Sequence, residues 1–204
     1  MIPEVGIMAK TEKRQISLEN PVTGHQVIFL QTGVETGVET SGELLQIEYV
    51  VPSREEPLQY IPLHFHHVAE ECFETLSGRL GVITGDKTRK RILEAGESIV
   101  IPPDTVHAFW NAAGEELRFI TDIRPAGEML TYWETAFGLA AKGQVDSKGA
   151  VTFWQVMALF PVMDTYLPGL PAGLQKTLFS PLVWLSHRLG YRATYPEVSA
   201  FQAA

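Results

Sequence analysis

The chain of 204 residues is acidic, with 24 aspartates and glutamates against 16 lysines and arginines and a formal net charge of −8. Because phosphate groups are bound by clustered lysines and arginines, this balance argues against a nucleic-acid partner and against an anionic membrane surface. Hydrophobic residues make up 45% of the sequence. That share excludes disorder along the whole chain, and the length suits one domain of ordinary size, alone or with an appendage.

Cys72 is the single cysteine of the chain. The chain can therefore form no internal disulfide and no zinc site with several cysteine ligands, which fits a reducing compartment. The first residues lack the apolar segment of a signal peptide, and no apolar stretch has the length of a membrane span. We therefore predict a cytoplasmic protein with no membrane partner.

Up to about residue 125 the sequence predicts β-strands. Short runs rich in valine, isoleucine, phenylalanine and threonine occur at residues 26–32, 44–51, 72–76, 79–84, 97–102 and 117–123. Turn residues such as glycine, proline, asparagine and aspartate separate these runs. Many short strands at this spacing are typical of a β-sandwich or a β-barrel.

Beyond residue 125 the hydrophobic period becomes that of a helix. Between residues 130 and 141, apolar side chains recur every three or four positions, as on one helical face. A second, very apolar helix is predicted at residues 150–160, with Pro161 at its end. A third is predicted within residues 168–191, with a break near Pro181.

This change of period divides the chain into a β-barrel domain with an N-terminal arm, residues 1–125, and a helical extension, residues 126–204. The aromatic residues of the extension are Trp133, Phe137, Phe153, Trp154, Phe160, Phe179 and Trp184. Because the extension lacks a basic polar face, we expect it to pack on the barrel or on a partner subunit rather than on a membrane. Exposed apolar area of this kind promotes association, so we predict a homodimer.

Three histidines and one glutamate of the β region form a candidate metal site. His64 and His66 are two residues apart, so on a strand their imidazoles point to the same face. Glu71 begins the next strand, and the turns near residues 85 and 96 bring a later strand, starting near His107, across from the first pair. Imidazole nitrogens favour iron, nickel, copper or zinc, and the carboxylate keeps manganese open, so the sequence predicts one divalent transition metal ion.

The same residues fall in two stretches that resemble the motifs of the cupin family, HFHHVAEECFETLSG at 64–78 and GESIVIPPDTVHAFWN at 96–111. The matched positions are His64, His66, Glu71 and Gly78 in the first motif and Gly96, Pro102, His107 and Asn111 in the second. The resemblance implies an all-β fold over roughly residues 20–125, the double-stranded β-helix or jelly-roll cupin barrel, followed by a C-terminal α-helical extension. It also implies that His64, His66, Glu71 and His107 are the metal ligands.

Two positions depart from the motifs. Leu58 stands where the first motif usually opens with a glycine, which indicates a different preceding turn and leaves the ligands untouched. Asp104 replaces the glycine that follows the proline of the second motif. That place needs a positive φ angle, which aspartate tolerates better than most residues, so we expect the turn to be retained with some strain.

Strand alternation predicts which neighbours of the ligands face the interior. Phe73 and Thr75 share the face of Glu71, and Phe109 and Asn111 share the face of His107. These four are the candidate substrate-pocket residues. The alternatives are a plain core role for the two phenylalanines and a structural role for Asn111, bonding backbone near the turn.

Other polar residues are assigned to the surface or left open. His67 has the opposite strand parity to His66, so we place it at the rim. His25 is expected to be solvated in a turn. Cys72 is expected to point away from the metal and to pack against other side chains. Arg118 is expected at the surface. In the strand at 44–51, either Leu45, Ile47 and Tyr49 point inward or Gln46 and Glu48 do. The sequence does not decide between these two orientations.

For function, the sequence and the resemblance favour a metal-dependent oxidoreductase or dioxygenase that acts on a small organic molecule inside the barrel. No general acid or base is identified besides the ligand set, so a non-catalytic module that binds or senses a small molecule is the first alternative. The second is a metal-free isomerase or epimerase, which needs a histidine base and a tyrosine acid and no glutamate; the presence of Glu71 argues against it.

Overall fold

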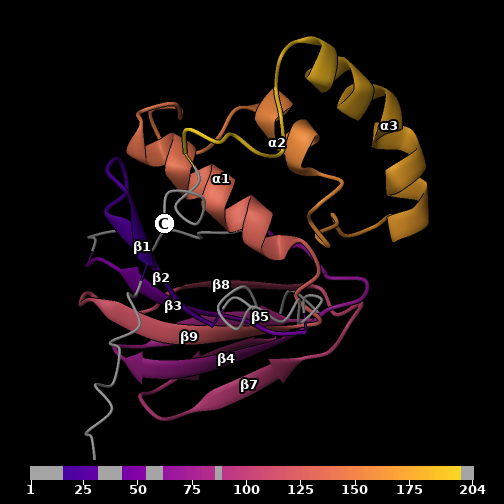
Figure 1. Ribbon diagram of the computed structural model, residues 1–204. Coiled ribbons are helices and arrows are strands. Elements are labelled where there is room, and N and C mark those ends of the chain that lie inside the picture. Colours follow the sequence, from indigo (N-terminus) through magenta and orange to yellow (C-terminus); the bar gives the residue numbers. More distant parts are fainter. Residues whose placement is uncertain (1–15, 32–42, 54–61, 86–88, 199–204) are drawn as a thin grey trace, which may run out of the picture.

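The computed structural model describes residues 16–31, 43–53, 62–85 and 89–198. Within these residues the chain forms strands first and helices last (Figure 1). The strands are β1 (Ile16–Asn20), β2 (His25–Gln31), β3 (Leu45–Val51), β4 (Glu70–Ser77), β5 (Leu80–Thr84), β6 (Lys90–Leu93), β7 (Ser98–Ile101), β8 (His107–Asn111) and β9 (Leu117–Arg124). The helices are α1 (Met129–Ala141), α2 (Phe153–Leu159) and α3 (Ala172–Arg188). Leu58 lies outside the described residues.

The strands form two antiparallel sheets, as the jelly-roll prediction requires. One sheet has the order β1-β2-β3-β9-β4-β7 and the other the order β6-β5-β8. The predicted all-β double-stranded β-helix with a helical extension is therefore confirmed. Two of the strands, β1 and β6, were not predicted. Both lie at a sheet edge, and three of the four residues of β6 are exposed, so neither carries a strong hydrophobic pattern.

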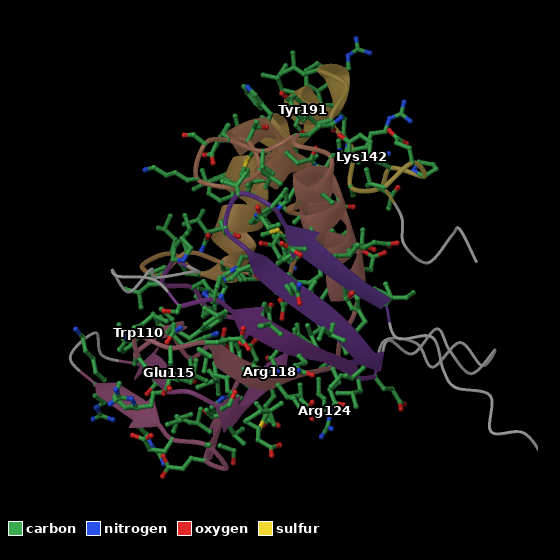
Figure 2. All side chains as sticks on the ribbon, turned by 90° about the vertical axis from the view of Figure 1, so that its left-hand side faces the viewer. Trp110, Glu115, Arg118, Arg124, Lys142 and Tyr191 are labelled. Carbon is green, nitrogen blue, oxygen red and sulfur yellow. The ribbon has the colours of Figure 1, made fainter. Side chains whose placement is uncertain are left out.

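Strand β3 settles the orientation that the sequence leaves open. Leu45, Ile47 and Tyr49 are buried in the main hydrophobic cluster. Glu48 points to the other side of the sheet, where its Oε1 atom accepts a hydrogen bond of 2.8 Å from Nε of Arg118 on β9. Arg118 is largely exposed, as predicted, because a guanidinium group stays hydrated even when it pairs. Figure 2 shows Arg118 and Arg124 below the helical part, which Lys142 and Tyr191 mark.

Helix α1 belongs to the same hydrophobic core as the barrel. Its side chains Met129, Trp133 and Phe137 are buried together with strand residues such as Phe29 and Tyr49. Trp133 packs edge-on against Tyr49, with ring centroids 5.3 Å apart. Helix α1 therefore packs directly on the barrel.

A polar contact also ties the first strand to the extension. The side chain of Asn20, at the end of β1, donates a hydrogen bond of 2.8 Å to the carbonyl oxygen of Gly149, in the loop before α2. The two residues are 129 positions apart in the sequence.

Helices α2 and α3 lie beyond α1, with α3 farthest from the strands (Figure 1). Helix α2 ends before Pro161, as expected. The predicted break near Pro181 is wrong, because α3 continues through this residue to Arg188. Pro181 is exposed, so water can bind the carbonyl group that the proline leaves without a donor. None of the helices described is long and apolar enough to span a membrane.

Candidate metal centre

The four predicted ligands meet inside the barrel. His64 and His66 are each 4% exposed, Glu71 is 5% exposed and His107 is fully buried. One ligand atom from each residue lies within 4.8 Å of the others. This is the only such buried group of histidine, cysteine and acidic residues found among the described residues. The arrangement is consistent with one metal ion held by three nitrogen atoms and one oxygen atom.

Backbone pairing brings the two histidine motifs together. The N–H group of His64 donates to the carbonyl of His107 at 3.0 Å, and the N–H of His107 donates to that of His64 at 2.8 Å. Between the motifs, Gly78 ends strand β4 with a φ angle of +74°, and a Cβ atom there would lie 2.6 Å from the carbonyl oxygen of Glu116. Glycine at this motif position therefore allows the turn that sends the chain from β4 into β5.

The second nitrogen of each imidazole is held by a backbone carbonyl. His64 Nδ1 lies 2.8 Å from the Pro62 oxygen, and His107 Nδ1 lies 2.9 Å from the Thr105 oxygen. His66 Nδ1 lies 2.6 Å from the oxygen of Asp164. Because a carbonyl oxygen can only accept, each Nδ1 atom carries the hydrogen, so that a ring in its neutral form offers its Nε2 lone pair. Metal-binding histidines are usually oriented in this way, so the donor set fits a metal ion.

The carboxylate of Glu71 lies at the centre of the cluster. Its Oε2 atom is 2.9 Å from Nε2 of His107 and 3.5 Å from Nε2 of His66. Its other oxygen accepts a hydrogen bond of 2.9 Å from the hydroxyl of Thr121 on β9. Thr121 is fully buried and fixes the orientation of the carboxylate. Sequence reasoning missed Thr121, although strand alternation with Phe119 and Ile123 would have placed it inside.

The electrostatics of the cluster differ from one ligand to the next. Burial and the neighbouring imidazoles of His107 and His66 lower the pKa of His64 from 6.5 to about 3, so its ring is neutral at pH 7. Burial alone would raise the pKa of Glu71, but its contacts with the imidazoles of His107 and His66 hold it well below its usual range. Burial lowers the pKa of His66, but its contact with Glu71 outweighs this and raises the pKa. A metal ion therefore competes with a proton at His66.

Two residues at the rim behave as predicted. His67 is exposed and does not join the cluster; its Nδ1 atom lies 2.8 Å from Oδ1 of Asp104. Asp104 has a φ angle of +59°, which confirms the strained turn expected where the motif usually has glycine. The N–H group of Asp104 donates to the carbonyl of His66 at 2.7 Å, so this turn holds the second motif against the first.

The prediction that His25 is solvated is wrong, because its side chain is only 8% exposed. The residue begins strand β2, and alternation places it on the same buried side as Val27 and Phe29. Cys72 is partly buried on β4, where the acidic side chain of Asp122 faces it across the strand pair. Burial and that negative charge raise the pKa of its thiol, which does not favour a reactive thiolate.

The candidate pocket residues Phe73, Thr75, Phe109 and Asn111 are all buried. Phe73 and Phe109 pack edge-on, with ring centroids 5.2 Å apart, and Phe73 lies 6.3 Å from the ring of His107. A pair of packed aromatic side chains thus lies next to the candidate metal ligands. The hydroxyl oxygen of Thr75 has no hydrogen-bond partner among the described residues. A substrate contact for these side chains stays a prediction.

Asn111 makes contacts with the backbone of the turn, as its alternative, structural interpretation predicts. Its side-chain nitrogen donates to the carbonyl of Glu115 at 2.8 Å, and its oxygen accepts from the N–H of Ala113 at 3.0 Å. Both bonds close the turn between β8 and β9, near Trp110 and Glu115 in Figure 2.

We therefore expect Asn111→Ala to lower the free energy of unfolding by about 1–3 kcal/mol, because the carbonyl of Glu115 and the N–H of Ala113 lose their hydrogen-bond partner. Metal content should stay at the wild-type level. Urea denaturation and elemental analysis check the two parts. Thr75→Val is the matched control, since it removes a hydroxyl without a partner and should be neutral or stabilising. A larger loss for Thr75→Val than for Asn111→Ala would contradict this assignment.

Comparisons with known proteins agree with the fold. Residues 54–123 match the family described as Cupin domain. No match was found among curated proteins. Among solved structures, the chain is similar to an uncharacterized conserved protein with a double-stranded β-helix domain from Klebsiella pneumoniae. The two are 19% identical, the match covers 42% of this chain and 70% of that chain, and the TM-score is 0.36.

The chain is also similar to hydroxypropylphosphonic acid epoxidase from S. wedmorenis, with 17% identity, 58% of this chain and 59% of that chain covered, and a TM-score of 0.41. For the DMSP lyase DddQ from Ruegeria pomeroyi, the identity is 24%, the coverage is 41% of this chain and 39% of that chain, and the TM-score is 0.34. In both cases less than two thirds of the other protein is covered. These similarities carry no conclusion about the activity of this chain. The match over residues 54–123, which spans both histidine motifs, shows that the chain contains a cupin domain, followed by the three helices described above.

Proposed function

We propose that this protein is a metal-dependent cupin enzyme, an oxidoreductase or dioxygenase that acts on a small organic molecule inside the barrel. The observation that supports this proposal most strongly is the convergence of four buried ligand atoms within 4.8 Å of one another. Each of the three imidazoles is also oriented by a carbonyl at its Nδ1 atom. Buried polar groups in this number are costly unless they share a partner, and a metal ion is the partner that suits all four.

The donor set determines which ions fit. Three imidazole nitrogens and one carboxylate oxygen suit iron, manganese, nickel, copper or zinc in the divalent state. Four protein ligands leave one or two positions of a five- or six-coordinate ion open. A metal ion bound there would supply Lewis-acid or oxygen-binding chemistry.

The residues around the ligands would bind and orient an apolar part of the substrate. Phe73 lies directly beside His107, and Phe109 and Phe119 continue the aromatic surface, with their ring centroids 5.3 Å apart. These buried side chains would keep water away from a metal held by the ligands and form an apolar surface beside it. A phenol or a diketone, small and partly apolar, matches such a lining.

The test is elemental analysis of protein purified without added metal, followed by oxygen-uptake measurements with a panel of phenols and diketones. We expect about one transition metal ion per chain and oxygen uptake that depends on substrate. Glu71→Gln should lose both metal and uptake. Glu74→Gln, on the same strand but exposed, should keep both. A wild-type protein that contains no transition metal and binds none on titration would contradict the proposal.

A non-catalytic role in binding or sensing a small molecule is the second candidate. Among the described residues, the buried carboxylates and imidazoles other than the four ligands are Glu48 and His25. Glu48 is paired with Arg118, and His25 lies on β2, so neither is a general acid or base for a molecule at the metal. Tight binding of a panel compound with no turnover would favour this role.

The metal-free isomerase or epimerase is supported less. Such chemistry needs a tyrosine acid, and Tyr49 does lie inside the barrel. Its ring, however, is stacked on Phe119 at a centroid distance of 4.9 Å and packed against Trp133. Burial and the negative charge of Glu71 raise the pKa of Tyr49 well above its usual value. A tyrosine held in this way is a core residue rather than a proton donor in open space.

The proposed partners are a small molecule and a second copy of the chain, with no nucleic acid. Large apolar side chains on α3 are exposed, among them Leu174, Leu178 and Trp184, which supports the predicted homodimer. A cytoplasmic location is supported by the single, unpaired cysteine.

A further inference from the structure

The helical extension returns to the metal centre after α2. The N–H group of Phe65 donates to the carbonyl of Tyr166 at 3.0 Å, and the N–H of Tyr166 donates to that of Phe65 at 2.9 Å. The neighbouring His64 forms the same kind of bridge with His107. The short segment that carries His64 and His66 is therefore held by two backbone bridges. One bridge comes from the second motif and the other from the helical extension.

Asp164 makes the decisive contacts on the side of the extension. Its carbonyl oxygen lies 2.6 Å from Nδ1 of His66. One oxygen of its carboxylate accepts two further hydrogen bonds, from the N–H of Val68 at 2.7 Å and from the N–H of Ala69 at 2.8 Å. Both belong to the turn between His66 and Glu71. A single residue of the extension thus fixes one ligand ring and the turn that sets the spacing between two ligands.

Asp164 is itself held in place by the core. Its N–H group points to the sulfur atom of Met129 at 3.4 Å, and Met129 is buried where α1 packs on the barrel. Two positions further on, Tyr166 packs against the rings of Phe65 and Phe160, with centroid distances of 5.6 and 5.8 Å. The carbonyl and carboxylate of Asp164 are therefore presented to the turn from a fixed position.

We propose that Asp164 is a positioning residue of the metal centre, so that the helical extension completes a site whose ligands all lie in the barrel. The inference rests on the proposed metal binding at His64, His66, Glu71 and His107. Asp164 does not bind the metal. It sets the orientation of His66 and the conformation of the turn that leads to Glu71.

The expected effect on metal affinity follows from these contacts. In Asp164→Ala the N–H groups of Val68 and Ala69 lose their common acceptor, and the turn gains conformational freedom that metal binding must then remove. Loss of an outer contact that orients a ligand lowers metal affinity by about 10- to 100-fold. Asp164→Asn keeps the shape and a weaker acceptor oxygen, so its affinity should lie between those of the wild type and Asp164→Ala.

The experiment is a titration of the metal-free full-length protein with Co²⁺ in competition with a chelator, together with the visible absorption spectrum of bound Co²⁺. Asp146 provides a matched control in the same extension. Its carboxylate also accepts two backbone hydrogen bonds, from Lys148 at 2.8 Å and Ala150 at 2.9 Å, but in a loop away from the ligands. Asp146→Ala should therefore leave affinity and spectrum unchanged, while Asp164→Ala weakens Co²⁺ binding about 10- to 100-fold and alters the spectrum.

The outcomes separate this inference from the proposed function. If the wild type binds Co²⁺ and both Asp164 variants bind it equally well, the positioning role is wrong and the metal centre stands. An equal loss of affinity in Asp146→Ala would show a general effect on stability, and would also overturn the inference. Absence of binding by the wild type would overturn the metal centre itself. If Asp164→Ala does not fold, the comparison rests on Asp164→Asn.

Discussion

Replacing His107 with alanine is expected to abolish stoichiometric metal binding. The imidazole is fully buried, its Nδ1 atom is held by the carbonyl of Thr105, and its Nε2 atom lies 2.9 Å from the carboxylate of Glu71. The substitution removes one of the three nitrogen ligands at a fully buried position. Elemental analysis of the purified variant measures the result, and His64→Ala should behave in the same way.

The matched control is His67→Ala, which removes an imidazole one residue from His66. His67 is exposed and contacts Asp104 rather than the ligand cluster, so its loss should leave metal content near the wild-type level. Loss of metal in His67→Ala together with retention in His66→Ala would mean that the segment carrying these histidines is shifted by one residue. Because one residue exchanges the two faces of a strand, this pair of variants tests the register directly.

Deleting residues 126–204 is expected to make the barrel aggregate. The deletion removes Met129, Trp133 and Phe137, which are buried in one cluster with the barrel core, and so exposes the apolar surface beneath α1. Size-exclusion chromatography and sedimentation of the expressed fragment measure the outcome. A soluble, monomeric fragment would show that the barrel does not need its cover.

Two point variants test the same packing in the full chain. Trp133→Ala should lower the free energy of unfolding by about 3–5 kcal/mol, as is usual for a large aromatic residue lost from a core. Phe153→Ala, at the start of α2 with 57% of the residue accessible, should change it by less than about 0.5 kcal/mol. Similar losses in the two variants would contradict the core position of Trp133.

The sequence predicted best what depends on neighbours along the chain. His64 and His66 both join the cluster, as a two-residue period predicts, although they lie outside the named strands; the inward faces of Phe73 and Phe109 follow from strand alternation. The resemblance to the cupin motifs supplied the register that joins Glu71 and His107. His25 was misjudged because the strand boundary was placed one residue late, although alternation would have put it inside.

Contacts between distant segments could not be predicted. Asp164 lies 98 positions from His66, in a loop without a strand or helix pattern of its own, and nothing in a single sequence connects the two. Thr121 is a different case. Alternation along β9 predicts that its side chain faces inward, but it does not predict the hydrogen bond to Glu71. The edge strands β1 and β6 were missed because few of their side chains need burial, and burial is what gives a strand its pattern.

The bond between Asn20 and Gly149 has a consequence for how the chain matures. A contact that spans 129 positions closes a very long loop, and chains dominated by such contacts fold slowly. During synthesis on the ribosome, the first strand leaves the exit tunnel long before its partner loop has been translated. The nascent barrel therefore lacks this contact until the loop has been translated, and pulse-labelling should show that full protease resistance arises only after that point.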